Sequence, residues 1–270
     1  MSGSALEALF KHENAIVLAA LRLLTLLAWV ALLAGAGTGM DPAAMSGWLM
    51  PFTLPAALSS PWTPFYWLVA FFMWVVMMVA MMLPSASPMV LLYARVMRHA
   101  ESQGQARHAS ASIAAFASGY LTLWILFSAL AVGLQYALEQ AGALSAMMSS
   151  RSVLLSGLLL IAAGLYQLTP LKTACLGHCR APAGFVAAHW RPGVIGAWRM
   201  GLSHGAHCVG CCLALMLLLF VGGVMNLVWI VALTLIVAVE KLAPFGALTA
   251  KMIAAALVAG GAAMLVFGSD

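Results

Sequence analysis

Long apolar runs dominate this sequence and leave little chain for anything else. A transmembrane helix needs about 20 consecutive apolar residues. Of the 270 residues, 64% are hydrophobic and 7% are charged, which excludes a soluble globular enzyme. We expect an all-α, polytopic membrane bundle of about seven transmembrane helices, forming a single domain over residues 15–270. The seven apolar runs cover residues 15–33, 65–83, 113–138, 153–168, 200–221, 224–239 and 248–267.

Two boundaries of these runs depend on local signals. Gly222 and Gly223 interrupt a long apolar stretch, and a glycine pair there favours a turn between two helices. The first run could instead be a secretory signal, because residues 34–36 resemble a small-residue cleavage site. Its length and the presence of Arg22 inside it favour a membrane span.

The basic residues predict the orientation of the bundle. With the N-terminus in the cytoplasm, Arg151 is the one residue among the 12 Lys and Arg that falls outside. Cytoplasmic loops are enriched in Lys and Arg, so we expect a multi-pass protein of the bacterial inner membrane, with the lipid bilayer as its main partner. Residues 1–14 then form a cytoplasmic segment, 38–64 an external surface loop and 170–199 a cytoplasmic loop.

The net charge of +5 gives no support for nucleic-acid binding, because no polar domain exists to present a basic face.

Prolines lie near the predicted cytoplasmic ends of three helices. Proline removes a backbone donor and interrupts the helical ladder. Pro84, Pro88, Pro170 and Pro244 are therefore expected to end their helices, or to free carbonyl groups for a polar vestibule.

The cysteines are confined to residues 175–212, and histidines accompany them at a repeated spacing. The positions i, i+3 and i+4 share one face of a helix. Histidine in an apolar helix is costly unless it is paired or lines a cavity, whereas a lone cysteine packs as a small hydrophobe. The repeated pattern therefore predicts a metal site near the reducing cytoplasmic side, where thiols persist. The candidate ligands are Cys175, His178, Cys179, His204, His207, Cys208, Cys211 and Cys212.

The ligand types narrow the choice of metal. Thiolate and imidazole together suit Cu(I) or Zn(II). Met77 and Met81 lie at i and i+4 in the second apolar run, and their thioethers favour Cu(I), although such a stripe is also typical of a packed core. Cu(I) is the expected ion. Zinc is an alternative, as is haem held between membrane histidines.

Three long motifs in the right order, spanning about residues 66–241, carry a family resemblance. The chain resembles the bacterial predicted metal-binding integral membrane proteins, which are grouped as a domain of unknown function. This resemblance implies a multi-helix membrane protein that binds a metal, copper in particular. Leu213 departs from the pattern, where an aromatic residue is expected. The motifs are Trp74-x-x-Met77-x-x-Ala80-Met81-Met82-x-Pro84-Ser85-x-x-Pro88-Met89, Tyr166-Gln167-x-x-Pro170-Leu171-Lys172 with residues 175–180, and Gly201-x-x-His204-Gly205-x-x-Cys208-x-Gly210-Cys211-Cys212 followed by Glu240-Lys241.

The expected function is the handling of Cu(I), either as transport or as delivery to a copper enzyme, with a metallochaperone as a further candidate partner. Cys175, His178 and Cys179 would capture the ion, and His204, Cys208, Cys211 and Cys212 would receive it. Met216 could act with Met77 and Met81 as a deeper ligand. The alternative is a membrane oxidoreductase, in which Cys208 and Cys211 support thiol exchange or the same residues hold a redox metal or haem.

Two further features have plain structural explanations. Gly201, Ser203 and Gly205 match a serine hydrolase pattern, but that pattern needs a strand-to-helix turn, and the glycines favour close helix packing instead. Glu240 and Lys241 are expected to be boundary charges that reach water. In the functional alternative, Lys241 and Lys172 offset the negative charge of a thiolate-bound ion.

Overall fold

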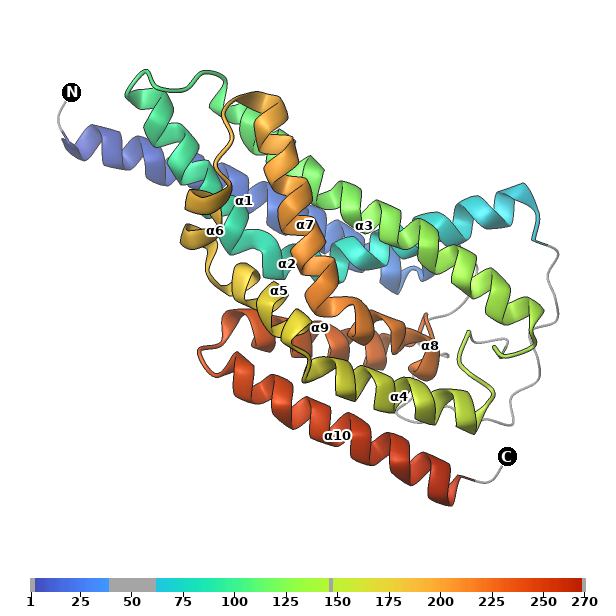
Figure 1. Ribbon diagram of the computed structural model, residues 1–270. Coiled ribbons are helices and arrows are strands. Elements are labelled where there is room, and N and C mark those ends of the chain that lie inside the picture. Colours follow the sequence, from blue (N-terminus) through green and yellow to red (C-terminus); the bar gives the residue numbers. More distant parts are fainter. Residues whose placement is uncertain (1–2, 39–61, 146–147, 269–270) are drawn as a thin grey trace.

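The computed structural model describes residues 3–38, 62–145 and 148–268, and every named element in this part of the chain is a helix (Figure 1). The expectation of an all-α fold is confirmed. Most of the predicted external loop at 38–64 lies outside the described residues. The elements are α1 (Gly3–Leu33), η1 (Gly35–Gly37), α2 (Pro64–Ser102), α3 (Ala109–Gln140), α4 (Val153–Gln167), α5 (Pro170–Arg180), α6 (Pro182–His189), α7 (Gly193–Leu217), α8 (Leu219–Gly222), α9 (Leu227–Leu242) and α10 (Gly246–Phe267).

Every predicted apolar run carries a helix, but fewer of these helices meet the length of a membrane span. Five are long and apolar enough to cross a membrane, and a sixth is obtained if α4 and α5, bent by 63°, count as one span. Helix α9 has 16 residues. The count of about seven crossings therefore remains a prediction.

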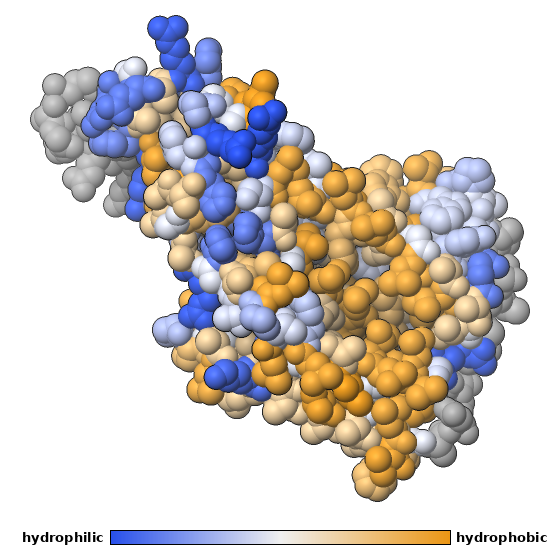
Figure 2. All heavy atoms as spheres, in the orientation of Figure 1, coloured by the Kyte–Doolittle hydropathy of each residue, from blue (hydrophilic) through white to orange (hydrophobic). Residues whose placement is uncertain are grey.

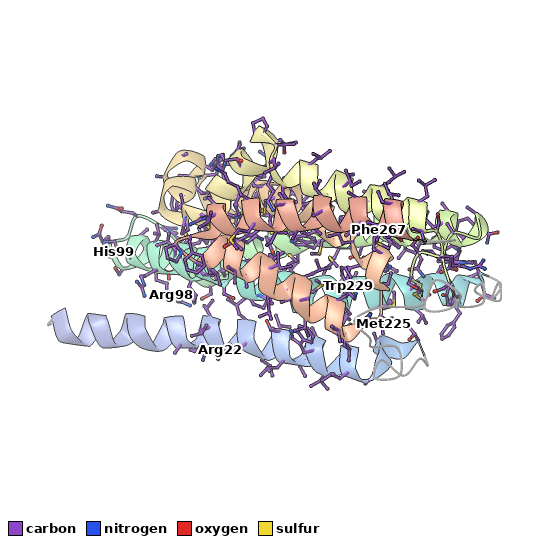
Figure 3. All side chains as sticks on the ribbon, turned by 90° about the horizontal axis from the view of Figure 1, so that it is seen from below. Arg22, Arg98, His99, Met225, Trp229 and Phe267 are labelled. Atoms are coloured by element: carbon purple, nitrogen blue, oxygen red, sulfur yellow. The ribbon has the colours of Figure 1, made fainter. Side chains whose placement is uncertain are left out.

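The surface separates into an apolar body and a polar end. Figure 2 shows hydrophobic side chains over most of the visible face, whereas hydrophilic ones gather where α2 ends and α3, α6 and α7 begin. Arg98 and His99 lie at this end, and Met225, Trp229 and Phe267 lie toward the other (Figure 3). Leu130 and Phe267 are 75% and 84% exposed. Apolar exposure on this scale is unusual for a soluble monomer and is compatible with insertion into a bilayer.

Close helix contacts rely on glycine. Helix α7 packs along α3, and a Cβ at Gly201 would overlap the carbonyl oxygen of Phe116, while one at Gly205 would lie 3.1 Å from the Tyr120 carbonyl oxygen. The interpretation of Gly201 and Gly205 as small residues for helix packing is thus confirmed. Both lie inside α7, so the strand-to-helix turn of a serine hydrolase is not formed there.

The prediction that Pro84 and Pro88 end a helix is wrong. Helix α2 continues through both residues to Ser102. Nearby serines bond to its carbonyl groups: the Ser85 hydroxyl donates to Met82 at 2.9 Å, and that of Ser87 donates to Leu83 at 3.0 Å. These bonds go to carbonyl groups near the two prolines, in a helix that neighbouring helices surround.

The other breaks lie where the sequence predicts them. Pro170 begins α5, and Pro244 lies between α9 and α10. Helix α8 ends at Gly222, and Gly223 adopts a φ of 97°, which favours glycine. The predicted turn between the two apolar runs is therefore confirmed. Residues 170–199, predicted as a loop, form α5, α6 and the first turns of α7.

The α3–α7 contact predicts an asymmetric effect of two alanine substitutions. Gly201→Ala should destabilise the protein by about 1–3 kcal/mol, because the new methyl group overfills the contact. Gly133→Ala is the matched control, since nothing lies within 4 Å of a Cβ at that position in α3. Thermal unfolding in detergent measures both variants. A melting temperature for Gly201→Ala equal to that of the control would contradict the packing.

Candidate metal centre

The five cysteines gather where α5 packs against α7. Cys179 Sγ of α5 lies 4.0 Å from Cys211 Sγ of α7, which lies 3.4 Å from Cys212 Sγ. A Cβ at Gly210 would lie 2.8 Å from Cys175 Sγ, so Cys175 packs directly on α7. All five cysteines are free thiols. We call this set the thiol cluster: Cys175, Cys179, Cys208, Cys211 and Cys212.

Contacts to α9 hold α5 in place. The Thr169 hydroxyl accepts from the backbone N–H of Lys172 and caps the start of α5. The Lys172 ammonium then donates to Glu240 at 2.6 Å and to Gln167. At the other end, Arg180 donates to the carbonyl oxygens of Ala243 and Pro244, each at 2.9 Å. Because both ends of α5 are fixed, Cys175 and Cys179 are held against α7.

Cys208 is the point where side chains and backbone from four helices meet. The Lys241 ammonium of α9 donates to Cys208 Sγ at 2.9 Å and to the Ser85 hydroxyl of α2 at 3.3 Å. The Tyr120 hydroxyl of α3 lies 3.2 Å from the same sulfur and 3.2 Å from the carbonyl oxygen of Met82. A buried ammonium needs a partner of opposite charge, and at this position the partner is a sulfur. The arrangement favours a Cys208 thiolate.

The prediction that Glu240 and Lys241 reach water is wrong. Their exposed fractions are 1% and 7%, because α9 lies between α2 and α10. The two charges face different neighbours: Glu240 pairs with Lys172, and Lys241 points to Cys208. Of the two lysines considered for charge compensation, Lys241 therefore lies beside the thiols.

His204 is buried without a hydrogen-bond partner in the described residues. It is 2% exposed, and neither ring nitrogen is bonded. Its ring stacks against those of Tyr120 and Phe116, with centroids 5.4 and 6.1 Å away. Since buried polar groups normally have partners, this imidazole is suited to a ligand. It precedes Cys208 by one helical turn in α7.

His178 of α5 and His207 of α7 stack on each other. Their ring centroids lie 4.2 Å apart, and His189 of α6 lies 6.0 Å from His178 and 6.1 Å from His207. We call these three residues the histidine cluster. His189 was not predicted as a ligand, because its place depends on α6 folding back over α7. The sequence offered one signal for His189, which is a histidine within the segment that contains the cysteines.

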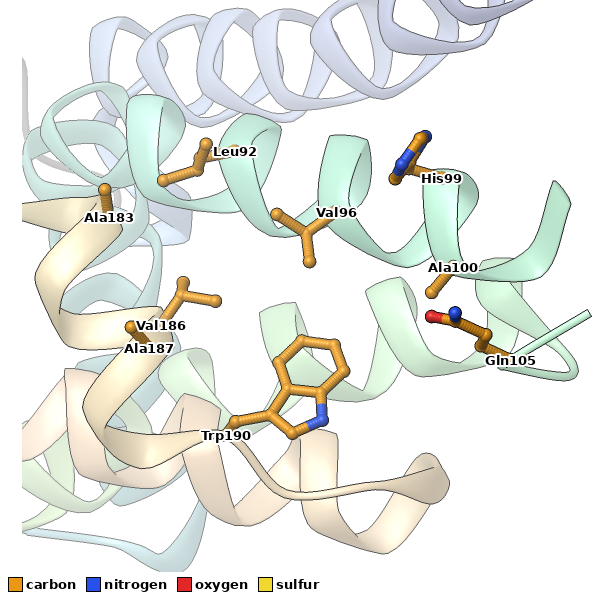
Figure 4. A pocket seen from close by; sticks show the side chains of 9 residues that line it. All are labelled: Leu92, Val96, His99, Ala100, Gln105, Ala183, Val186, Ala187 and Trp190. Carbon is orange, nitrogen blue, oxygen red and sulfur yellow. The ribbon is translucent and has the colours of Figure 1, made fainter. Parts of the chain in front are cut away.

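Helix α6 presents its other side to α2. A groove of about 600 Å³ runs between them (Figure 4). Ala183, Val186 and Ala187 of α6 line it, together with Trp190 directly after the helix. Phe185 and His189 lie on the α7 side. The helical spacing of the two sets keeps His189 directed at α7.

The predicted methionine ligands lie in the apolar core. Met77 and Met81 are fully buried, in the same cluster of core residues as Cys208, Cys211, Cys212 and Met216. Met77 is close in sequence to Trp74, whose indole N–H donates to Gln135 Oε1 at 2.9 Å. Packing accounts for their burial, and ligation by Met77 and Met81 remains a prediction.

The candidate ligands are neighbours but do not form a preorganised coordination shell. Within residues 3–38, 62–145 and 148–268, no group of three or more His, Cys, Asp or Glu stands ready to hold a metal ion.

Comparison with known protein families places this architecture in a class. A family described as a copper chaperone, PpoB2, matches residues 71–264. The match covers most of the chain, so the protein belongs to this family. It includes α5, α7 and α9 with all five cysteines and Lys241, and it supports the expectation of copper handling. Comparison with curated proteins and with solved structures yields no match.

The Lys241–Cys208 contact predicts a change in thiol reactivity. In Lys241→Met, modification of Cys208 by methyl methanethiosulfonate should slow roughly tenfold at neutral pH, because the ammonium no longer favours the reactive thiolate. Lys251→Met is the control, since Lys251 is an exposed lysine of α10. Mass spectrometry of cysteine-containing peptides gives the rate at each site. Equal rates at Cys208 in wild type and Lys241→Met would contradict the assignment.

Proposed function

We propose that this protein is a multi-pass protein of the bacterial inner membrane that binds Cu(I) through its thiol cluster near the cytoplasmic side. It delivers the ion to a copper enzyme during maturation of that enzyme. The observation that carries this proposal is that thiols from α5 and α7 lie together, with the Lys241 ammonium in contact with one of them. Membership of the copper chaperone family supports delivery in preference to transport.

The charge balance of the thiol cluster suits a monovalent ion. Two thiolates around Cu(I) carry a net charge of −1, and the Lys241 ammonium would bring the buried total to zero. A divalent ion with the same two thiolates would leave one positive charge in the apolar core, which is costly. Soft thiolate ligands also select Cu(I) over harder ions.

The positions of the sulfurs suit stepwise transfer. Cys175 and Cys179 are partly exposed, whereas Cys208, Cys211 and Cys212 are buried. An ion captured on α5 would reach α7 through the Cys179–Cys211 contact of 4.0 Å. His204, with both ring nitrogens unbonded, offers an additional ligand beside Cys208. The ion would move by exchange of one ligand at a time, with Met77, Met81 and Met216 as candidate deeper ligands.

Copper retention tests the proposal. Anaerobically purified wild-type protein should hold Cu(I) against a bicinchoninate competitor, and a Cys208→Ser, Cys211→Ser double variant should lose at least about tenfold in affinity, because two soft ligands are removed. Ser203→Ala is the control, since Ser203 lies on the same helix outside the thiol cluster. Copper is quantified per protein in each case.

Equal copper in wild type and the double variant would contradict the ligand assignment. A thiol oxidoreductase using the same residues would instead hold little copper and would show a Cys208–Cys211 disulfide that forms and is reduced during turnover. The metal analysis, together with disulfide mapping of the same samples, separates these outcomes.

A further inference from the structure

In the histidine cluster, all three Nδ1 atoms lie within hydrogen-bonding distance of a backbone carbonyl oxygen. His178 Nδ1 lies 2.9 Å from the Ala174 carbonyl oxygen, His189 Nδ1 lies 3.1 Å from that of Phe185, and His207 Nδ1 lies 2.7 Å from that of Ser203. A carbonyl oxygen can only accept, so each Nδ1 must carry the proton and donate. In the neutral rings, each Nε2 then holds a free lone pair.

This pattern is the one found around metal-binding histidines. A ligating histidine almost always donates its other ring N–H to a carbonyl, a carboxylate or a water molecule, which fixes the tautomer and the ring orientation. Here three histidines from three helices, α5, α6 and α7, share this arrangement. Three independent helices thus present the same lone pair at one place.

The distances between the ring centroids are close to those expected for rings that bind one ion. With bonds of about 2.0 Å from each Nε2 to the metal, the centroids of two ligating rings lie roughly 5–6 Å apart. The two separations that involve His189, 6.0 and 6.1 Å, are near this range, whereas His178 and His207 are stacked at 4.2 Å. A small rotation that parts the stacked pair would let all three rings face one ion.

The cluster is accessible from outside and adjacent to the thiols. His178 and Phe185 line an open groove of about 310 Å³ between α5 and α6, and all three histidines are only partly buried. Along the chain, His178 precedes Cys179 and His207 precedes Cys208. Phe185 stacks on His189 at 4.4 Å and contacts the buried His204 at 5.4 Å. The histidine cluster therefore lies between the open groove and the buried ligands.

We infer that His178, His189 and His207 form a second metal site, which takes Cu(I) through imidazole Nε2 atoms and exchanges it with the thiol cluster. This inference rests on the proposed function for its cargo. Because imidazole is a weaker ligand for Cu(I) than thiolate, the histidine site governs how fast copper loads. The thiol cluster governs how tightly copper is held.

The kinetic test uses His189→Phe, which keeps a ring to stack on Phe185 but lacks the Nε2 lone pair. Stopped-flow transfer of Cu(I) from a bicinchoninate complex to the full-length protein should slow roughly tenfold, the scale of a lost metal-site interaction, while the final copper affinity stays unchanged. His99→Ala is the control, because His99 is an exposed histidine at the polar end of the bundle (Figure 3). Wild-type loading by His189→Phe would assign His189 to stacking alone and overturn the inference.

A second measurement separates this inference from the thiol assignment. In a protein with all five cysteines replaced by serine and given one equivalent of Cu(I), X-ray absorption should report nitrogen ligands, and adding His189→Phe should remove the bound copper. Retention of the same nitrogen-bound copper after His189→Phe would overturn the histidine site whatever the thiols do. Failure of the wild type to hold copper through sulfur, with the nitrogen signal intact, would refute the proposed function and leave the histidine site standing.

Discussion

The contact between the Lys241 ammonium and Cys208 Sγ organises the centre of the bundle. An ammonium among apolar helices is costly unless a counter-charge accompanies it, and at 2.9 Å the sulfur is positioned to supply one. The same lysine reaches Ser85 of α2, and the same sulfur lies beside Tyr120 of α3. One polar contact therefore ties together α2, α3, α7 and α9, with the other thiols arranged around it.

A neighbouring ion pair explains why Lys241 contacts a thiol and not a carboxylate. Lys172 and Glu240 neutralise each other, so Lys241 is left facing the thiols. The candidate ligands divide into a set of thiols, of which those on α7 are buried, and a partly open set of imidazoles, with His204 buried near both. Such a gradient, from weaker ligands near the surface to stronger ligands inside, suits a protein that accepts an ion, holds it and gives it up again.

The apolar runs were sufficient to predict the helices, and the glycine pair at Gly222 and Gly223 was sufficient to predict a turn, because both signals act locally. Helical spacing placed the cysteines of α7 on one face of that helix, but it could not place Cys175 and Cys179 of α5 against them. The sequence could not show how each helix is rotated about its axis, or which distant residues pack against it. Helix α2 continues through Pro84 and Pro88, although proline usually ends a helix. Which of Glu240 and Lys241 faces the thiols depends on how α9 is rotated, and the role of His189 depends on the path of α6.

The coordination of copper in the loaded protein tests the central claim most directly. X-ray absorption on wild-type protein loaded anaerobically with one Cu(I) should give an edge typical of Cu(I) and a first shell dominated by sulfur, as expected for an ion held by the cysteines of α5 and α7. A first shell made only of nitrogen or oxygen would contradict the account.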